Sequence, residues 1–239
     1  MHPFKRIFSA ATGYWIHKVS TLPVGTDLYV DIHRRIGIGS FKTMFDVGAN
    51  IGQTWEWFRD NESNAIIYCF EPVSATFSDL KEKTKNDTKC ITENIALGGH
   101  PCEKKIKIFS GNSALNSLRD DVMNNDSNAK EETIIVDTLD NYCRRKSIDK
   151  IDFLKIDTEG YELNVLEGAE NMLESARIAF VFCEVGFLRR NNRNTYLADV
   201  TEWLANKNYH FFGLYQLVSN GQNIEFGNAL FVHKDILNR

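Results

Sequence analysis

The sequence lacks the features that mark a disulfide-stabilised scaffold or a cysteine metal site. Its five cysteines are scattered, no two of them stand in a CxxC pair, and no second type of metal ligand accompanies them. Cys69 and Cys183 lie inside apolar runs, where a free cysteine behaves as a small buried hydrophobic residue. We therefore expect no disulfide framework and a reducing compartment, the cytoplasm.

An excess of basic charge and a long apolar run are also absent. The chain has 28 basic and 32 acidic residues and no visible basic stripe, so nucleic-acid binding through phosphate neutralisation is not expected. Apolar residues at 4–15 fall near helical spacing, but Thr12, Gly13 and His17 interrupt them. This excludes a signal sequence or a membrane span there and predicts a docked amphipathic helix. Contact with a membrane surface is the open alternative.

Short apolar runs organise the rest of the chain, and no internal repeat or linker divides it. Near-continuous apolarity in segments this short favours strands buried on both faces of a parallel sheet. The runs cover residues 44–47, 65–70, 153–156 and 178–183. Helical patterns follow them at residues 52–59, 74–85 (with Ser74 as the expected N-cap), 163–173 and 199–205. The alternation predicts an α/β fold with right-handed crossovers.

Two segments depart from this alternation. Residues 110–130 are polar and are predicted to form a long loop, the natural place for substrate recognition. Residues 210–234 predict two strands around the turn Ser219-Asn220-Gly221, so an antiparallel hairpin should close one sheet edge. We expect one domain over residues 1–239, with an N-terminal helical cap or substrate-side segment over 1–40 and the core over 41–239.

An acid ends each of the four apolar runs. In an open parallel sheet, ligands bind in the crevice beyond the carboxyl ends of the strands. The acids are therefore expected to converge on one rim: Asp46, Glu71, Asp157 and Glu184. The alternative is that the strands simply end where polar residues begin.

The turn Asp46-Val47-Gly48-Ala49-Asn50-Ile51-Gly52 joins the first run to its helix. Gly48 allows a tight turn with positive φ, and Gly52 lets the helix start close to the sheet. The GxGxxG spacing of dinucleotide enzymes and the Gly-Lys-Ser/Thr of a P-loop are both absent. The Asp46 carboxylate would repel a pyrophosphate by about 4 kcal/mol at contact distance and a dielectric constant of roughly 20. It suits the ammonium and sulfonium of S-adenosylmethionine, so the sequence favours this cofactor over NAD.

Glu71 follows the next run. An acid at the end of that strand can accept hydrogen bonds from both ribose hydroxyls of an adenosyl group, and Pro72 then ends the strand. The segment Glu93-Asn94-Ile95-Ala96 should end a third strand on the same side, where an adenine edge could be recognised. Alternatively, Asn94 only caps a turn.

These motifs resemble the FkbM family of methyltransferases, and the similarity extends from about Leu22 almost to the C-terminus. The residues that carry it are 45–53, 70–72, 94–97, 165–169, 229–232 and, most specifically, Leu154-Lys155-Ile156-Asp157-Thr158-Glu159-Gly160-Tyr161-Glu162. The resemblance implies a Rossmann-like class I methyltransferase fold with a mostly parallel seven-stranded sheet and helices on both faces. It also implies S-adenosylmethionine as cofactor and O-methylation of a sugar, glycan or secondary metabolite.

The resemblance also implies cofactor positions. Those that match the family are Asp46, Gly48, Asn50, Gly52 and Glu71, and the predicted cofactor site is completed by Ala49, Gln53, Asn94 and Ala96. Asn228 stands where the family often has aspartate, which leaves the role of that position open.

The candidate catalytic residues follow the third run. Asp157 and Glu159 could remove the proton of an alcohol acceptor. Lys155 points to the same side as Asp157 by strand alternation and could stabilise that carboxylate. In the alternative interpretation, Asp157 only positions the cofactor, and Glu159 or Glu162 caps the next helix.

Several rival interpretations are open. Asp157, Glu159 and Glu184 could instead hold Mg²⁺, but no histidine or second aspartate is nearby, so we expect no metal. Another polar group, formed by His33, Arg34 and Arg35, could contact substrate or form a solvated turn.

Two other classes of protein are also open. A non-catalytic adenosyl-binding module would keep Asp46 and Glu71 but would not need Asp157 and Glu159. A nucleotide-dependent oxidoreductase would need the third glycine of the GxGxxG motif and no acid at the position of Asp46. The expected partner is a small-molecule or glycan acceptor, without firm membrane association.

Overall fold

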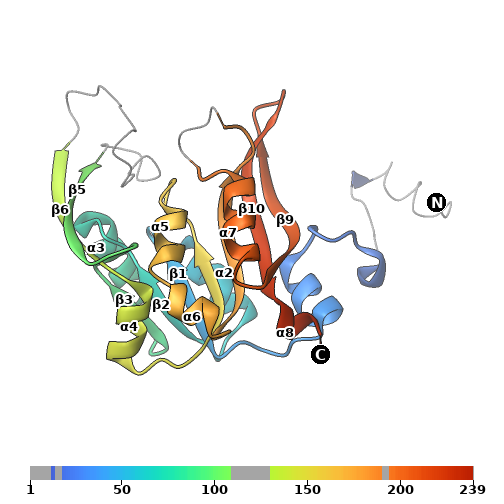
Figure 1. Ribbon diagram of the computed structural model, residues 1–239, viewed down its shortest axis with the longest axis horizontal. Coiled ribbons are helices and arrows are strands. Elements are labelled where there is room, and N and C mark those ends of the chain that lie inside the picture. Colours follow the sequence, from blue (N-terminus) through green and yellow to red (C-terminus); the bar gives the residue numbers. More distant parts are fainter. Residues whose placement is uncertain (1–11, 14–17, 109–129, 190–193, 239) are drawn as a thin grey trace. The chain divides into compact units, whose positions relative to one another are not determined.

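The computed structural model describes residues 12–13, 18–108, 130–189 and 194–238 (Figure 1). Residues 110–129 of the polar loop predicted over 110–130 lie outside these residues, and Lys130 begins a strand instead. Almost all of the helix predicted over 4–15 also lies outside them. The chain forms two compact units, Met1–Ile38 and Gly39–Arg239. The expected single-domain organisation stays a prediction.

The first unit contains a 3-10 helix, η1 (Val19–Thr21), and a π-helix, η2 (Val30–Ile36). Buried Asp31 accepts a hydrogen bond from the Gly25 N–H at 2.8 Å and pairs with Arg35 at 2.6 Å. The Nδ1 atom of His33 lies 2.8 Å from the Ile38 carbonyl oxygen. His33 and Arg35, considered above as substrate contacts, thus make contacts within this unit.

A seven-stranded sheet forms the centre of the second unit, with the strand order β3-β2-β1-β7-β8-β10-β9 (Figure 1). The parallel strands are β3 (Cys90–Glu93), β2 (Ile66–Phe70), β1 (Thr43–Val47), β7 (Ile151–Ile156) and β8 (Ile178–Gly186). β10 (Ile224–His233) runs antiparallel to β8 and to the edge strand β9 (Tyr209–Ser219). This confirms the four predicted strands, the closing hairpin and the Rossmann-like class I fold.

Helices cover both faces of this sheet. On the face that carries Phe153 and Lys155, the Phe58 ring of α2 (Gln53–Asn61) packs edge-on against Phe153, with centroids 5.6 Å apart. α3 (Ser74–Thr84) lies beside α2.

Four helices cover the opposite face of the sheet, which carries Phe45, Leu154 and Ile156. These helices are α4 (Leu139–Lys146), α5 (Glu162–Glu167), α6 (Glu170–Glu174) and α7 (Leu197–Ala205). The short helix α8 (Lys234–Leu237) follows β10.

Two local predictions are wrong. The helix expected over 163–173 is two helices, because Gly168 lies against the Gly98 backbone, where an added Cβ would be 2.0 Å from the carbonyl oxygen. The Asp140 carboxylate accepts hydrogen bonds from the first N–H groups of α6. Val73, rather than Ser74, is the N-cap of α3, because the backbone of Val73 is extended and the helix begins at Ser74. Ser74 does not cap the helix and instead donates its N–H and its hydroxyl to Glu132.

A small second sheet was not predicted. It consists of β4 (Ala96–Leu97), β6 (Lys130–Asp137) and β5 (Cys102–Ile108), in the order β4-β6-β5. Its Ile106, Ile134 and Val136 pack with Val73 and Tyr161 into a separate apolar cluster. This packing holds the sheet next to the carboxyl end of β2. None of the described helices is long and apolar enough to cross a membrane.

Candidate active site

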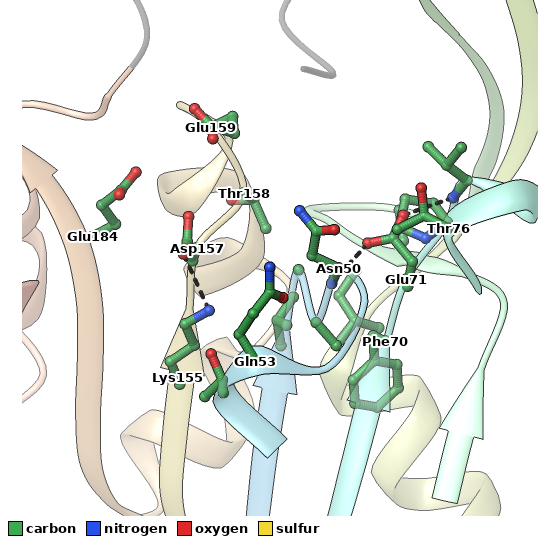
Figure 2. Close-up of a pocket in the computed structure, with 18 of the residues that line it drawn as sticks. Asn50, Gln53, Phe70, Glu71, Thr76, Lys155, Asp157, Thr158, Glu159 and Glu184 are labelled. Carbon is green, nitrogen blue, oxygen red and sulfur yellow. Dashed lines mark hydrogen bonds and ion pairs between the residues drawn. The ribbon is translucent and has the colours of Figure 1, made fainter. Parts of the chain in front are cut away.

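A cavity of about 910 Å³ lies at the carboxyl ends of β1, β2, β7 and β8 (Figure 2). A cavity of this size accommodates a cofactor and part of a second ligand. Of the four acids expected on this rim, Glu71, Asp157 and Glu184 line the cavity, whereas Asp46 lies behind its wall. Figure 2 shows Glu71 on one side, Asp157 and Glu184 on the other, and Asn50 and Gln53 between them.

The turn after β1 forms the floor of the cavity. The N–H groups of Gly48 and Ala49 donate to the Phe70 carbonyl oxygen at 3.1 and 3.0 Å. Gly48 has a φ of 81°, and an added Cβ would lie 1.8 Å from the Asp157 carbonyl oxygen. Only glycine satisfies both the backbone conformation and this close approach. The turn is thereby held directly against the end of β7.

Besides Asp46, two of the predicted cofactor residues, Gly52 and Asn94, do not line the described cavity. Gly52, with a φ of 88°, precedes α2 and faces Leu80 of α3, where an added Cβ would be 3.0 Å from a methyl carbon. The Asn94 amide donates to the carbonyl oxygens of Glu71 and Pro72, at 2.9 Å each. Both residues shape the site from behind. The other predicted positions that line it are Gly48, Ala49, Asn50, Gln53, Glu71 and Ala96.

Glu71 is oriented by backbone donors on either side of it. Its Oε2 accepts from the Asn50 N–H at 3.1 Å, and its Oε1 accepts from the Val73 N–H at 3.0 Å. The side chain is 7% exposed, and this burial raises the pKa of Glu71 to about 7 despite the two donors. Each carboxylate oxygen retains a lone pair for a further donor, such as a ligand hydroxyl.

A buried ion-pair chain corrects the role expected of Asp46. The Lys155 Nζ lies 3.3 Å from Asp46 Oδ1 and 3.1 Å from Asp157 Oδ2. Asp46 is fully buried on the same sheet face as Lys155, so its charge meets this ammonium rather than a ligand. Burial raises the pKa of Asp46, and the charge of Lys155 opposes this rise. Burial lowers the pKa of Lys155, but Asp157 and Asp46 outweigh it and raise the pKa overall, so Lys155 stays protonated.

The predicted catalytic residues lie together at one end of the cavity. Lys155, Asp157 and Glu159 all line it, and Glu184 faces them from β8 (Figure 2). Burial, and after it the charges of Asp157 and Glu159, raise the pKa of Glu184 to about 9, so this side chain is protonated at neutral pH. The Asn194 amide donates to Glu184 Oε2 at 2.5 Å.

The magnesium alternative finds no support in the described part of the chain. No group of three or more histidine, cysteine, aspartate or glutamate residues is arranged there to hold a metal ion. With Glu184 protonated and Lys155 beside Asp157, this end of the cavity instead combines a hydrogen-bond donor, acceptors and a fixed cation.

Sequence reasoning missed several residues that line the cavity. They are Phe70, Thr76, Ile106, Leu188, Asn194, Glu225 and Phe226, among others. Phe226 could have been found, because the predicted hairpin brings the start of β10 opposite Gly186 of β8. Ile106 had no such signal, since β5 pairs with a strand that begins beyond the long polar segment.

The residues present fit S-adenosylmethionine. Glu71 offers carboxylate oxygens suited to ribose hydroxyls, and Phe70, Ile95 and Leu97 line the cavity with apolar surface suited to a base. Asp157 and Glu159 supply negative charge suited to the ammonium and sulfonium groups.

Comparison with known proteins gives the family. Residues 46–211 match the family described as the Methyltransferase FkbM domain. A search of curated proteins finds no match. Similar solved structures include M. capricolum TrmK with S-adenosyl-homocysteine (12% identity, TM-score 0.48, 81% of this chain and 62% of that chain). Another is the Synechocystis magnesium protoporphyrin IX methyltransferase with bound SAM (9% identity, TM-score 0.47, 98% of this chain and 92% of that chain).

The family match covers most of the chain and includes the turn after β1, Glu71 and the segment around Asp157. This chain spans 62% of the length of TrmK, and these structures resemble it in fold alone. Family membership and the chemistry of the cavity agree on the cofactor. The chain therefore belongs to the FkbM methyltransferase family, and its cofactor is S-adenosylmethionine.

Proposed function

We propose that this chain methylates a hydroxyl group of a sugar, glycan or secondary metabolite. The observation that carries the proposal is Asp157, a carboxylate that lines the cavity and lies 3.1 Å from the protonated Lys155. The cofactor supplies an electrophilic methyl group on a sulfonium. A hydroxyl oxygen is a weak nucleophile, so a base within reach of its proton accelerates attack.

The surrounding residues support an alcohol acceptor. Asp157 is one-third exposed, so its outer oxygen is accessible to a hydroxyl while Lys155 holds the inner one. The protonated Glu184 can donate a hydrogen bond to an acceptor oxygen, and Glu159 can accept one from a neighbouring hydroxyl. Orientation of the acceptor oxygen beside Asp157 adds to the effect of the base.

The test is methyl transfer from labelled S-adenosylmethionine to a panel of glycans, polyols and amines, with wild type and Asp157→Asn. The expected result is a labelled ether product and a fall in kcat of about 100-fold or more in Asp157→Asn. Calorimetry should show that cofactor binding survives in this variant, weakened by the loss of one of the two negative charges near the sulfonium. Asp152→Asn is the control, because Asp152 lies at the opposite end of β7 and binds the N–H groups of Lys42 and Thr43.

Three results would contradict the proposal in different ways. Undiminished turnover in Asp157→Asn would remove that residue as the base. Transfer to amines alone would exclude the hydroxyl. Cofactor binding without transfer to any acceptor would favour a non-catalytic adenosyl-binding module.

We also propose a cytoplasmic location. All five cysteines are free, as suits a reducing compartment. Fractionation of the source cells, with antibody detection of the chain, would test this, and recovery from an oxidising compartment would contradict it.

A further inference from the structure

The Glu162 carboxylate is fully buried and binds the loop that follows β7. Its Oε1 accepts from the Thr158 N–H at 3.0 Å, the Thr158 hydroxyl at 3.1 Å and the Gly160 N–H at 3.0 Å. This loop begins at Asp157, and its Thr158 and Glu159 line the cavity. One carboxylate oxygen thus organises the loop that carries the proposed base.

The other oxygen of Glu162 binds a different segment. Its Oε2 accepts from the Thr195 N–H at 3.3 Å and also from the Thr195 hydroxyl. The preceding residue, Asn194, lines the cavity and donates to Glu184. Through its two oxygens, Glu162 therefore joins the loop after β7 to the segment after β8.

The loop that Glu162 holds has an unfavourable backbone conformation. Glu159 and Gly160 both have positive φ, at 52° and 95°. A non-glycine residue persists in this region only where its surroundings hold it there. Two N–H groups of this loop, those of Thr158 and Gly160, converge on one oxygen of the Glu162 carboxyl group. Burial raises the pKa of Glu162, and the donors from Thr195, Gly160 and Thr158 counteract this rise.

We propose that Glu162 is a positioning residue that couples these two walls of the site, so that displacing one releases the other. The consequence for catalysis rests on the proposed function, since it concerns the placement of Asp157 opposite Glu184. The coupling itself does not depend on it. A residue that only stabilised its own helix would not transmit a change from Thr195 to Thr158.

Hydrogen exchange measured by mass spectrometry on the full chain tests the coupling. Thr195→Val removes a hydroxyl donor from the segment after β8 and leaves the loop after β7 unaltered in sequence. We expect amide exchange in a peptide covering 157–161 to become about five- to tenfold faster. Glu162→Gln should accelerate exchange in that peptide and in one covering 194–197. Thr201→Val is the matched control, because the Thr201 hydroxyl binds the Leu197 carbonyl oxygen within α7 at 2.7 Å.

Activity gives a second readout. In Thr195→Val, kcat should fall at least tenfold while the Kd for S-adenosylmethionine changes less than about threefold. Unchanged exchange at 157–161 in a folded Thr195→Val chain would overturn the coupling. Should Glu162→Gln fail to fold, Thr195→Val and Thr158→Val still decide the matter. If no acceptor is ever methylated but the exchange pattern is found, the proposed function fails and the coupling stands.

Discussion

Gly48 shows at the scale of a single residue how backbone conformation and close packing act together. It has positive φ and would place a Cβ 1.8 Å from the Asp157 carbonyl oxygen. Gly221, in the β9–β10 turn, has a similar φ of 87° but nothing within 4 Å. We expect Gly221→Ala to lower the free energy of unfolding by about 1 kcal/mol, and Gly48→Ala by about 3 kcal/mol or more, with loss of cofactor binding. Urea denaturation measures both, and equal losses would contradict the close approach.

Glu71 makes cofactor binding depend on pH. Its pKa is about 7 in the free protein, and its ionised form accepts hydrogen bonds from hydroxyls. Binding then favours deprotonation, so affinity for S-adenosylmethionine should rise up to about tenfold per pH unit below pH 7 and level off above it. Calorimetry at several pH values measures this dependence. Glu71→Gln should bind more weakly and without the dependence, and an equally steep profile in that variant would assign the titration to another group.

Some contacts between individual side chains could be predicted from the sequence, and others could not. Strand alternation correctly places Lys155 on the same side as Asp157. The pairing of Lys155 with Asp46 was not predicted, because it depends on the register between β1 and β7, which spacing along the sequence does not give. From the sequence, Glu159 or Glu162 was expected to cap the helix that follows Asp157. The second partner of Glu162, Thr195, lies in a distant segment, so only the fold brings the two together.

At the scale of elements, β8 carries a buried acid into the site. All nine residues of this strand are buried, and Glu184 has a pKa of about 9. Because the folded pKa exceeds that of the unfolded chain, the protonated acid favours the folded state, and this contribution declines as pH rises from about 5 to 9. We expect the stability of wild type to fall relative to Glu184→Gln over this range, by at most about 1.4 kcal/mol per pH unit. Urea denaturation at several pH values measures the difference, and parallel profiles would contradict the protonated state.

The elements themselves were predictable where apolar runs were short and clearly bounded. The hairpin followed from the turn around Gly221, and the parallel strands followed from β-branched and aromatic runs. The second sheet escaped prediction because its strands β5 and β6 carry many lysine and glutamate side chains and lie on either side of the polar segment. The break between α5 and α6 escaped because it depends on contact with the distant Gly98.

At the scale of the whole molecule, the charge of the cavity constrains the acceptor. The described residues that line it include one cation, Lys155, which is already paired, and the acids Glu71, Asp157, Glu159 and Glu225, besides the protonated and therefore neutral Glu184. A cationic cofactor offsets part of this charge, and a sulfated or phosphorylated acceptor would be repelled. We expect kcat/KM for a neutral glycan to exceed that for its sulfated form at least tenfold, with a smaller ratio at high salt. Steady-state kinetics on such a pair measures this, and preference for the anionic form would contradict it.

The identity of the cofactor decides whether the cavity works as proposed. A calorimetric titration of the full chain with S-adenosylmethionine, and a parallel one with NAD, measures it. We predict saturable one-to-one binding of S-adenosylmethionine that is weakened at least tenfold in Glu71→Gln, and no saturable binding of NAD. Binding of NAD without binding of S-adenosylmethionine would contradict the assignment of this site.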